Sequence, residues 1–472
     1  MNILPRLFLA GIVTALLVQL PLHGATSTWD GGTESSENWS VPINWLGDIA
    51  PPLDGSADLV FSGNTGLFSN ANLDWNVRSI TFASGALSFN LHGNPLTIGA
   101  GGIVNADDSV QTIENDLVLS AAQTFRTAST GSMALNGTVN TNGRILTVNA
   151  ATDFITLGGA VTGSGGLVVT GGNSVVLAGG ASNTYTGGTT INGPIVLAKT
   201  GGAVAIPGAV IVGSVAAPAT LAIGFDEQIG NGSSVTVNAG SGISLGSGVT
   251  ETIGALALSG TAQVNNGTLN VGTVSMFGAT ITTGATGKFV LSGEITAVSA
   301  GQQRSVIAGN LNLAGATRTI TVIDGLATTE LEIPASISNG SLVKEGGGGV
   351  VFKGAQNYAS LTVHQGTVDL ETPLGTGAAS VNLSPVSGSA FLNFETDQRL
   401  ASLTIGNGGV VTLTGPGSPS DAIDSIASPL LFAEYEEEKI GQGGGAQSVP
   451  EPSAGMLLVV SITTLLAGRG RK

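Results

Sequence analysis

Residues 163–197 read GSGGLVVTGGNSVVLAGGASNTYTGGTTINGPIVL and contain three short apolar runs, at residues 167–169, 175–177 and 195–197. Each run has the length and the β-branched composition of a strand. The Gly pairs, Asn, Ser and Thr between them are typical of turns. No charged residue occurs from residue 154 to residue 198. The stretch therefore predicts strands joined by turns, without the groups that proton transfer requires.

The same alternation of short apolar runs and turn residues continues from residue 77 to about residue 431. Most runs read apolar–polar–apolar, which places one face of a strand in a core and the other in water. A shortened copy of the quoted stretch occupies residues 339–370 and lacks its Tyr-Thr-Gly-Gly-Thr segment. Residues 77–431 are therefore predicted to be Gly-rich β-strand repeats, with the best repeat at 163–197.

Evenly spaced short strands without helices are typical of sandwiches, propellers and solenoids. A propeller needs a constant blade length of about 40–50 residues, and the sequence shows no such period. A parallel β-helix tolerates variable loops, because each coil only has to return a strand to its neighbour. We therefore predict an all-β chain folded as a right-handed parallel β-helix, with coils of ~20–25 residues stacked ~4.8 Å apart.

The composition narrows the class of protein. The 472 residues include 73 Gly, 42% are hydrophobic and only 10% are charged, which is unlike a disordered chain. A formal net charge of −16 argues against a nucleic-acid partner, because phosphates would be repelled. The chain has no cysteine, which excludes disulfides and thiolate metal sites. Its stability must come from the size of its core.

Residues 1–25 are predicted to be a secretory signal peptide. They contain Arg6, an apolar run at residues 7–20 and small residues at 24–25. The alternative is a permanent membrane helix, but the run is short and lacks a charged stop on its far side.

Residues 26–76 contain all four tryptophans of the chain, Trp29, Trp39, Trp45 and Trp75. A stack of repeats exposes an open strand edge at its end, and this edge needs a cap. We therefore predict a Trp-rich N-terminal cap. The alternative is a glycan contact through the ring faces of Trp29, Trp39 and Trp45.

The last forty residues combine several sorting features. Residues 432–448 form an acidic and Gly-rich linker, and residues 449–472 begin with the motif Pro450, Glu451 and Pro452. An apolar run follows at residues 454–467, and as a helix of ~22 Å it is short for a ~30 Å hydrocarbon core. The basic residues Arg469, Arg471 and Lys472 would hold the end of this run in the cytoplasm.

The repeat at residues 165–197 resembles the autotransporter-associated β-strand repeat, a Gly-rich unit with the pattern GGLxKxGxGxLxLxGxNTYTGGTTxxxGxLxL. The match includes the Asn-Thr-Tyr-Thr-Gly-Gly-Thr-Thr segment at residues 183–190, and the copy at 339–370 supplies Lys344 where the first has Val169. The resemblance implies a secreted or surface-displayed β-helical rod with an adhesive or structural role.

The tail at residues 449–472 resembles the PEP-CTERM sorting signal. This resemblance implies that a membrane enzyme of the exosortase type recognises Pro450, Glu451 and Pro452, while Arg469, Arg471 and Lys472 act as the membrane stop. It also implies export by a Gram-negative-type bacterium, with transient anchoring in the inner membrane before the protein is secreted or displayed on the cell surface.

Acidic clusters and histidines are the candidates for chemistry. The best cluster is Asp107 and Asp108 with Glu114 and Asp116, and a weak metal site at Asp107 and Asp108 is the alternative to a solvated loop. Further candidates are Asp226, Glu227, His92 and His364. The histidines are single and far apart in sequence. We predict neither a metal nor a cofactor.

These observations predict an exported, non-catalytic surface or extracellular-matrix protein, structural or adhesive and associated with exopolysaccharide. The alternatives are a β-helical polysaccharide lyase or hydrolase, and a carbohydrate-binding protein on the same fold.

Overall fold

A computed structural model describes residues 24–32, 36–374, 379–396 and 398–413. The predicted signal peptide up to residue 23, the linker at 432–448 and the sorting tail at 449–472 lie outside these residues. No helix in the described part of the chain is long and apolar enough to cross a membrane.

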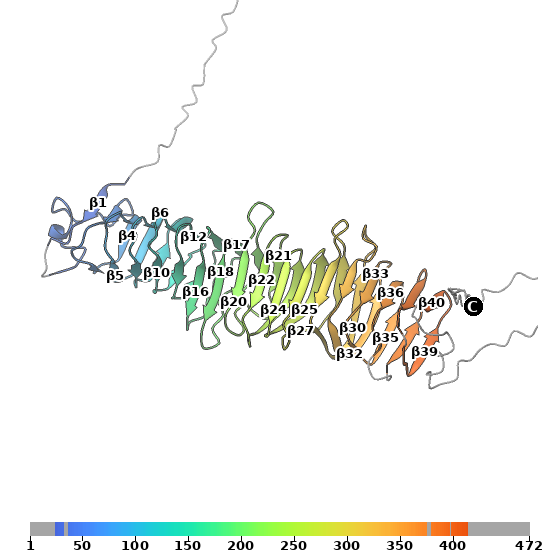
Figure 1. Cartoon of the computed structure of the whole chain (residues 1–472). Helices are drawn as coiled ribbons and strands as arrows, with labels where there is room; N and C mark the ends of the chain where they lie inside the picture. Colours follow the sequence, from blue (N-terminus) through green and yellow to red (C-terminus); the bar gives the residue numbers. More distant parts are fainter. Residues whose placement is uncertain (1–23, 33–35, 375–378, 397, 414–472) are drawn as a thin grey trace, which may run out of the picture.

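The chain folds into a parallel β-solenoid of about 16 turns with almost no helix (Figure 1). Every pair of named strands is parallel, and the strands of a face bond to those one coil before or one coil after them. The prediction of an all-β parallel solenoid is confirmed. The single short helix among the described residues is η1 (Pro42–Asn44).

The strands of the solenoid lie on three faces, and in some coils a loop takes the place of a strand on face 3. Face 1 consists of β1 (Thr26–Trp29), β2 (Asp58–Phe61), β9 (Gln123–Thr127), β12 (Leu146–Ala150), β15 (Leu167–Thr170), β17 (Thr189–Asn192), β19 (Val210–Val212), β21 (Ser234–Val237), β28 (Ile295–Val298), β35 (Ser360–Val363), β37 (Ser380–Leu383) and β39 (Ser402–Ile405).

Face 2 consists of β3 (Phe68–Ala71), β5 (Asn90–Gly93), β7 (Gln111–Ile113), β10 (Met133–Leu135), β13 (Ile155–Leu157), β16 (Val175–Gly179), β18 (Ile195–Lys199), β20 (Thr220–Ile223), β22 (Gly242–Leu245), β24 (Thr261–Asn265), β26 (Thr280–Thr283), β29 (Ser305–Ala308), β31 (Leu331–Ile333), β33 (Gly349–Phe352), β36 (Gly366–Leu370), β38 (Ala390–Phe394) and β40 (Gly409–Leu413).

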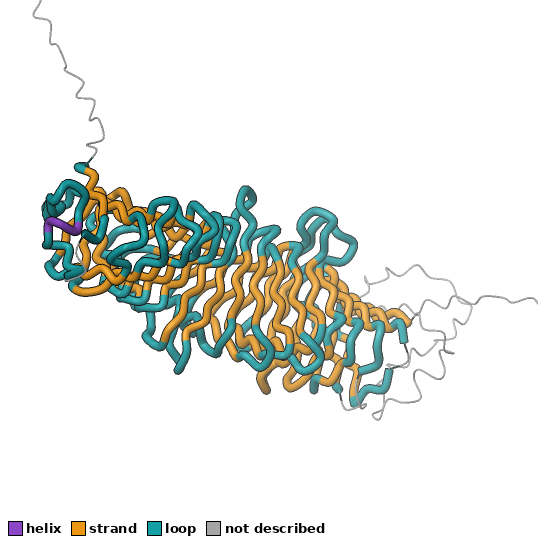
Figure 2. The backbone as a smooth tube through the Cα atoms, turned by 60° about the vertical axis from the view of Figure 1, so that its left-hand side comes forward, coloured by secondary structure: helices purple, strands orange, loops and turns teal. Residues whose placement is uncertain are grey.

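Face 3 consists of β8 (Leu117–Leu119), β11 (Val139–Asn140), β14 (Val161–Thr162), β27 (Lys288–Leu291) and β34 (Gln356–Asn357). Six longer strands turn the corner from face 3 to face 1 and contribute to both: β4 (Trp75–Phe82), β6 (Leu96–Asn105), β23 (Thr250–Leu258), β25 (Thr268–Phe277), β30 (Asn310–Val322) and β32 (Ser336–Glu345). Loops occupy the remaining corners (Figure 2).

The strand register gives the coil length. Leu146 pairs with Leu167 one coil later, and Leu167 pairs with Thr189, so these two successive coils are nearly equal in length. Other coils are shorter, as from Ala255 to Thr273, or longer, as from Val210 to Val235. The predicted coil length is therefore close to the observed one, and the variation lies in the corner loops.

The three apolar runs at residues 167–169, 175–177 and 195–197 form β15, β16 and β18, with alternate side chains buried. The interpretation of the residues between the last two runs as a turn is incomplete, since Thr189–Asn192 forms the strand β17 on face 1. Its Thr-Thr-Ile-Asn sequence follows a Gly pair and has one apolar residue, so it lacks the usual strand signal.

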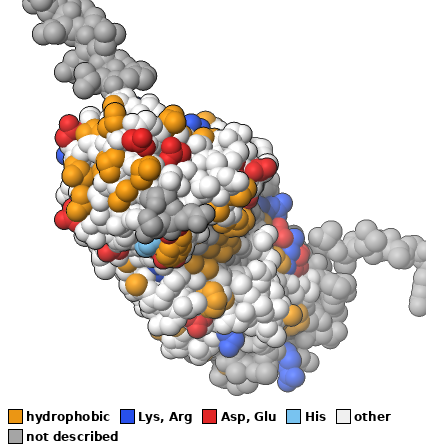
Figure 3. Space-filling model, turned by 90° about the vertical axis from the view of Figure 1, so that its left-hand side faces the viewer, with side chains coloured by type: hydrophobic (Ala, Val, Ile, Leu, Met, Phe, Trp, Pro, Cys, Tyr) orange, Lys and Arg blue, Asp and Glu red, His pale blue; other side chains and the backbone are white. Residues whose placement is uncertain are grey.

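The segment around η1 covers the first edges of the stack. Leu46 N–H donates to the Thr28 carbonyl of β1 at 2.8 Å, and Trp39 N–H donates to the Asn70 carbonyl of β3 at 2.9 Å. Both edges are therefore paired within the chain instead of being open to another molecule. Leu46 itself is 70% exposed. Figure 3 shows hydrophobic side chains on this end of the rod among uncharged and acidic ones, with few basic ones.

Candidate functional site

The tryptophans of the N-terminal segment lie inside the cap. Trp29, Trp39 and Trp45 are each 0% exposed. The rings of Trp29 and Trp45 meet edge to face with centroids 5.1 Å apart, and Nε1–H of Trp45 donates to the Trp39 carbonyl at 2.7 Å. Because no face of these rings reaches solvent, they cannot contact a glycan in the folded protein. Their burial disagrees with the glycan-contact alternative and agrees with a capping role.

The acidic cluster at Asp107 and Asp108 does not converge on one point. Asp107 is buried, and its carboxylate accepts N–H groups of Ser109 at 2.8 Å and Gly85 at 2.7 Å. Burial raises the pKa of Asp107, but these hydrogen bonds outweigh it, so the pKa lies below its ordinary value. Asp108 is exposed. The structure assigns Asp107 to a turn and to a contact between coils.

The other predicted acidic residues also bond along the stack. The carboxylate of Asp116 accepts the N–H of Thr138 at 2.7 Å, and that of Asp226 accepts the N–H of Thr250 at 2.7 Å. Glu114 accepts a hydrogen bond from the Asn90 amide at 3.1 Å, and Glu227 accepts one from the Thr252 hydroxyl at 3.0 Å. In the described part of the chain, no three His, Asp or Glu side chains are placed to hold a metal ion.

The two histidines among the described residues occupy separate places on the outer surface. His92 stacks on Phe68 with ring centroids 4.0 Å apart. His364 lies 2.6 Å from the carboxylate of Glu345, measured from Nδ1 to Oε1. The histidines lie on different coils near opposite ends of the stack, and neither joins the acidic cluster.

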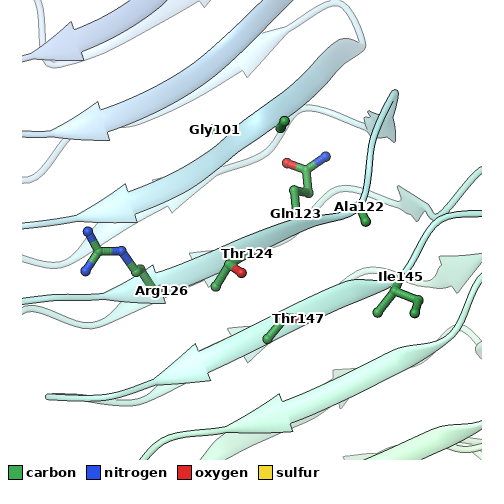
Figure 4. A pocket seen from close by; sticks show the side chains of 8 residues that line it. Gly101, Ala122, Gln123, Thr124, Arg126, Ile145 and Thr147 are labelled. Carbon is green, nitrogen blue, oxygen red and sulfur yellow. The ribbon is translucent and has the colours of Figure 1, made fainter. Parts of the chain in front are cut away.

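A shallow groove lies on face 1 (Figure 4). It begins at a bulge in β6, where Gly99, Ala100 and Gly101 stand opposite the single residue Arg78 of β4. Such a bulge bends the strand locally and increases its twist. The hollow has a volume of about 490 Å³ and is lined by Ala100, Gly101, Ala122, Gln123, Thr124, Arg126, Ile145 and Thr147.

A second hollow of about 370 Å³ continues the groove along the stack. Ile145 borders both hollows and is 52% exposed. The second hollow is lined by Ile145, Gly166, Val168, Gly187, Gly188, Thr189, Thr190, Ala209 and Ile211. The outward residues of both hollows form one column, in which Thr124, Thr147, Val168, Thr190 and Ile211 are register partners on successive strands.

Three polar residues of the first hollow, Gln123, Thr124 and Arg126, come from β9, and Thr147 comes from β12. Arg126 is exposed and has no ion-pair partner among the described residues. Gln123 is 5% exposed, and its amide donates to the Ile98 carbonyl at 2.9 Å. The Oε1 atom of Gln123 is buried without a hydrogen-bond partner in the described part of the chain. Figure 4 shows the Gln123 side chain rising from β9 toward Gly101.

Several buried ionisable residues were not predicted, among them Lys199, Lys344 and Glu251. Lys199 and Lys344 take inward positions on β18 and β32, and their Nζ atoms donate to backbone carbonyls, including Ala178 at 2.8 Å and Gly346 at 2.7 Å. Burial lowers the pKa of each lysine to about 8. The alternation of inward and outward residues along β18 could have indicated that Lys199 is buried, since residues 195, 197 and 199 all point inward.

Glu251 is the third of these residues. Its carboxylate accepts the N–H groups of Gln228 at 2.8 Å and Ile229 at 3.0 Å. Burial raises the pKa of Glu251 to about 8 against the effect of these two hydrogen bonds, and the nearby Glu227 and Asp226 raise it further. The carboxyl group is therefore mostly protonated in the folded protein below about pH 8.

No protein family, curated protein or solved structure matches the chain.

Proposed function

We propose that this protein is an exported, non-catalytic surface or matrix protein whose right-handed β-helical rod is structural or adhesive and lies among exopolysaccharide. The described fold supports this proposal because its candidate acidic side chains form hydrogen bonds between neighbouring coils instead of converging on a site. The acidic side chains that sequence alone suggested for chemistry accept backbone N–H groups one coil away, as Asp107, Asp116 and Asp226 do. This use of carboxylates is the observation that carries the proposal.

The route of export rests on the sequence. Residues 1–25 act as a signal peptide in this proposal, and Pro450, Glu451 and Pro452 are recognised by a sorting enzyme of the exosortase type. The prolines keep the segment before the apolar run extended, which exposes its backbone to a processing enzyme. Arg469, Arg471 and Lys472 hold the tail in the inner membrane until processing.

The test is the intact mass and the cell fraction of the mature protein, compared with a Pro450→Ala variant. We expect the unaltered protein outside the inner membrane, with both ends removed. The variant should keep its C-terminal residues and stay with the inner membrane. A product that is uncleaved and equally distributed in both cases would remove the sorting proposal. A reproducible cleavage of acidic polysaccharide, lost on combined Asp107→Ala and Asp108→Ala substitution, would show an enzyme instead.

A further inference from the structure

The groove on face 1 runs along the axis of the rod. It crosses β6, β9, β12, β15, β17 and β19, which are successive strands of one ladder. Five steps of ~4.8 Å give a length of ~24 Å. The step between strands is close to the length of one sugar unit in an extended glycan. A linear glycan in this groove would meet an equivalent register position at each successive unit.

The lining of the groove has the chemistry of a saccharide site. Hydroxyl groups of Thr124, Thr147 and Thr190 can both donate and accept hydrogen bonds. Ile145 and Ile211 offer apolar surface for the C–H face of a sugar ring. Both isoleucines are about half exposed, so apolar surface is available to be buried by a ligand.

Arg126 is the one charged residue among those that line the two hollows, so the groove itself is positively charged although the whole chain carries a formal net charge of −16. Arg126 has the neutral register partners Val104 on β6 and Asn149 on β12. A guanidinium without a partner pairs well with a carboxylate, which it can hold through two parallel hydrogen bonds. Gln123 takes an inward position on the same strand, where it is the register partner of the buried Leu146, and it supports the wall of the groove from inside.

We propose that this groove binds a linear acidic glycan, with the carboxylate of a uronic acid unit on Arg126 and the following units along the threonine column toward Ile211. This proposal rests on the proposed function, because an extracellular location is what would bring the protein into contact with such a glycan. The chemistry of the ligand is inferred from the groove. An acidic peptide is the competing ligand, and the test separates the two.

Gly188 provides a way to block the groove without straining the fold. A Cβ atom at Gly188 would have the Ala209 carbonyl oxygen at 4.0 Å as its nearest contact, which is ordinary contact distance. Gly188 is exposed and lines the second hollow. A Gly188→Tyr variant would therefore fill the groove with its ring. Gly232 is a matched control, since it is exposed outside the groove and a Cβ there would meet nothing within 4 Å.

The experiment measures binding of the purified full chain by isothermal titration calorimetry. The probes are an oligogalacturonate, a neutral cello-oligosaccharide of equal length and polyglutamate. We expect the oligogalacturonate to bind, and to bind at least 10-fold more weakly to Arg126→Gln and to Gly188→Tyr. Gly232→Tyr and Arg399→Gln, which changes another exposed arginine, should bind like the unaltered protein.

Equal affinity of Arg126→Gln and the unaltered protein for oligogalacturonate would overturn the proposal. Binding of polyglutamate as tight as that of the glycan would replace it with a peptide site. These results are independent of export: a rod that is exported but binds no acidic glycan contradicts only the groove, and a rod that binds the glycan but is not exported contradicts only the proposed function.

Discussion

The hydroxyl of Tyr185 lies 2.6 Å from Oγ1 of Thr189 inside the solenoid, further along the same coil. In the shortened copy of the repeat, Tyr358 stands at the corresponding place, and its buried hydroxyl has no hydrogen-bond partner among the described residues. The register gives the reason: Leu167 pairs with Thr189, whereas Leu342 pairs with Leu361, so an aliphatic side chain replaces the hydroxyl.

Removing the two tyrosine hydroxyls should therefore have opposite effects. Tyr185→Phe leaves the Thr189 hydroxyl buried without its partner and should lower the free energy of unfolding by about 1 kcal/mol. Tyr358→Phe removes an unsatisfied buried hydroxyl and should raise it by up to about 1 kcal/mol. The midpoint of urea unfolding measures both changes. Destabilisation of equal size by both substitutions would contradict the assigned hydrogen bond.

The Gly-Gly pair in the Thr-Gly-Gly-Thr segment gives a second matched comparison. A Cβ at Gly187 would lie 2.5 Å from the Gly165 backbone, whereas a Cβ at Gly188 would have its nearest contact at 4.0 Å. Gly187→Ala should therefore destabilise the protein by about 2–3 kcal/mol. Gly188→Ala should be neutral or stabilising by up to about 1 kcal/mol, because it restricts the unfolded chain. Urea unfolding of the two variants side by side would show the contrast, and similar midpoints would contradict the close packing at Gly187.

The raised pKa of Glu251 predicts that the free energy of unfolding falls as the pH rises from about 4.5 to about 8. Its folded-state pKa of about 8 lies above the ordinary value of 4.5, so the stability present below pH 4.5 is lost as the pH approaches 8. The slope contributed by this group is at most about 1.4 kcal/mol per pH unit. Glu251→Gln should flatten the dependence of the unfolding free energy on pH between these two values. An unchanged slope in the variant would show that other groups cause it.

The lowered pKa values of the two buried lysines predict the opposite trend: the free energy of unfolding rises with pH between about 8 and about 10.5. Their folded-state pKa of about 8 lies below the ordinary value of 10.5, so stability is present above pH 10.5 and is lost as the pH falls toward 8. With Glu251, this places a minimum of stability near pH 8. Lys199→Met combined with Lys344→Met should remove the rise between pH 8 and pH 10.5. Persistence of that rise in the double variant would contradict the assignment.

The cap predicts a change in association state. Trp45→Ala removes the ring that packs against Trp29 and Trp39, and should destabilise the cap by about 3–5 kcal/mol. The edge of β1 would then lose the pairing of Leu46 with Thr28 and become open to other strands. Light scattering after size-exclusion chromatography should show concentration-dependent association. A variant that unfolds locally but stays a monomer would show that the cap does not protect this edge.

The architecture could be predicted because the inward positions of most strands are Val, Ile or Leu. Inward positions that hold polar residues could not be predicted from this pattern. At Thr189 and Lys344 a polar residue takes an inward position, and only the partner provided by the fold makes it acceptable: the Tyr185 hydroxyl in one case and backbone carbonyls in the other. Tyr185 and Gly346 are close in sequence to the residues they contact, and the Gln365 carbonyl that Lys344 also contacts lies one coil later. The alternation of apolar and polar residues does not show which of these groups turn inward to meet the buried polar side chain.

The groove could be predicted only in part. The Gly-Ala-Gly-Gly run at residues 99–102 is a recognisable signal for a bulge within a strand. Arg126 and Ile145 border the same hollow because of the register between β6, β9 and β12. This register cannot be read from the sequence of any one strand. The acidic residues were candidates for a site because they lie close together in sequence. In the structure, carboxylates such as those of Asp116 and Asp226 instead accept backbone N–H groups of a neighbouring coil, as the register between coils dictates.

Because each strand bonds only to the coil before it and the coil after it, a coil can be gained or lost without any change to the remaining ones. The corner loops already absorb coils of unequal length, as the pairings of Ala255 with Thr273 and of Val210 with Val235 show, so such an event does not need a repeat of fixed length. Duplication of one coil would lengthen the rod by a single step of ~4.8 Å. Evolution can therefore adjust how far the protein reaches in small, nearly independent increments, while the sequences at its two ends stay the same.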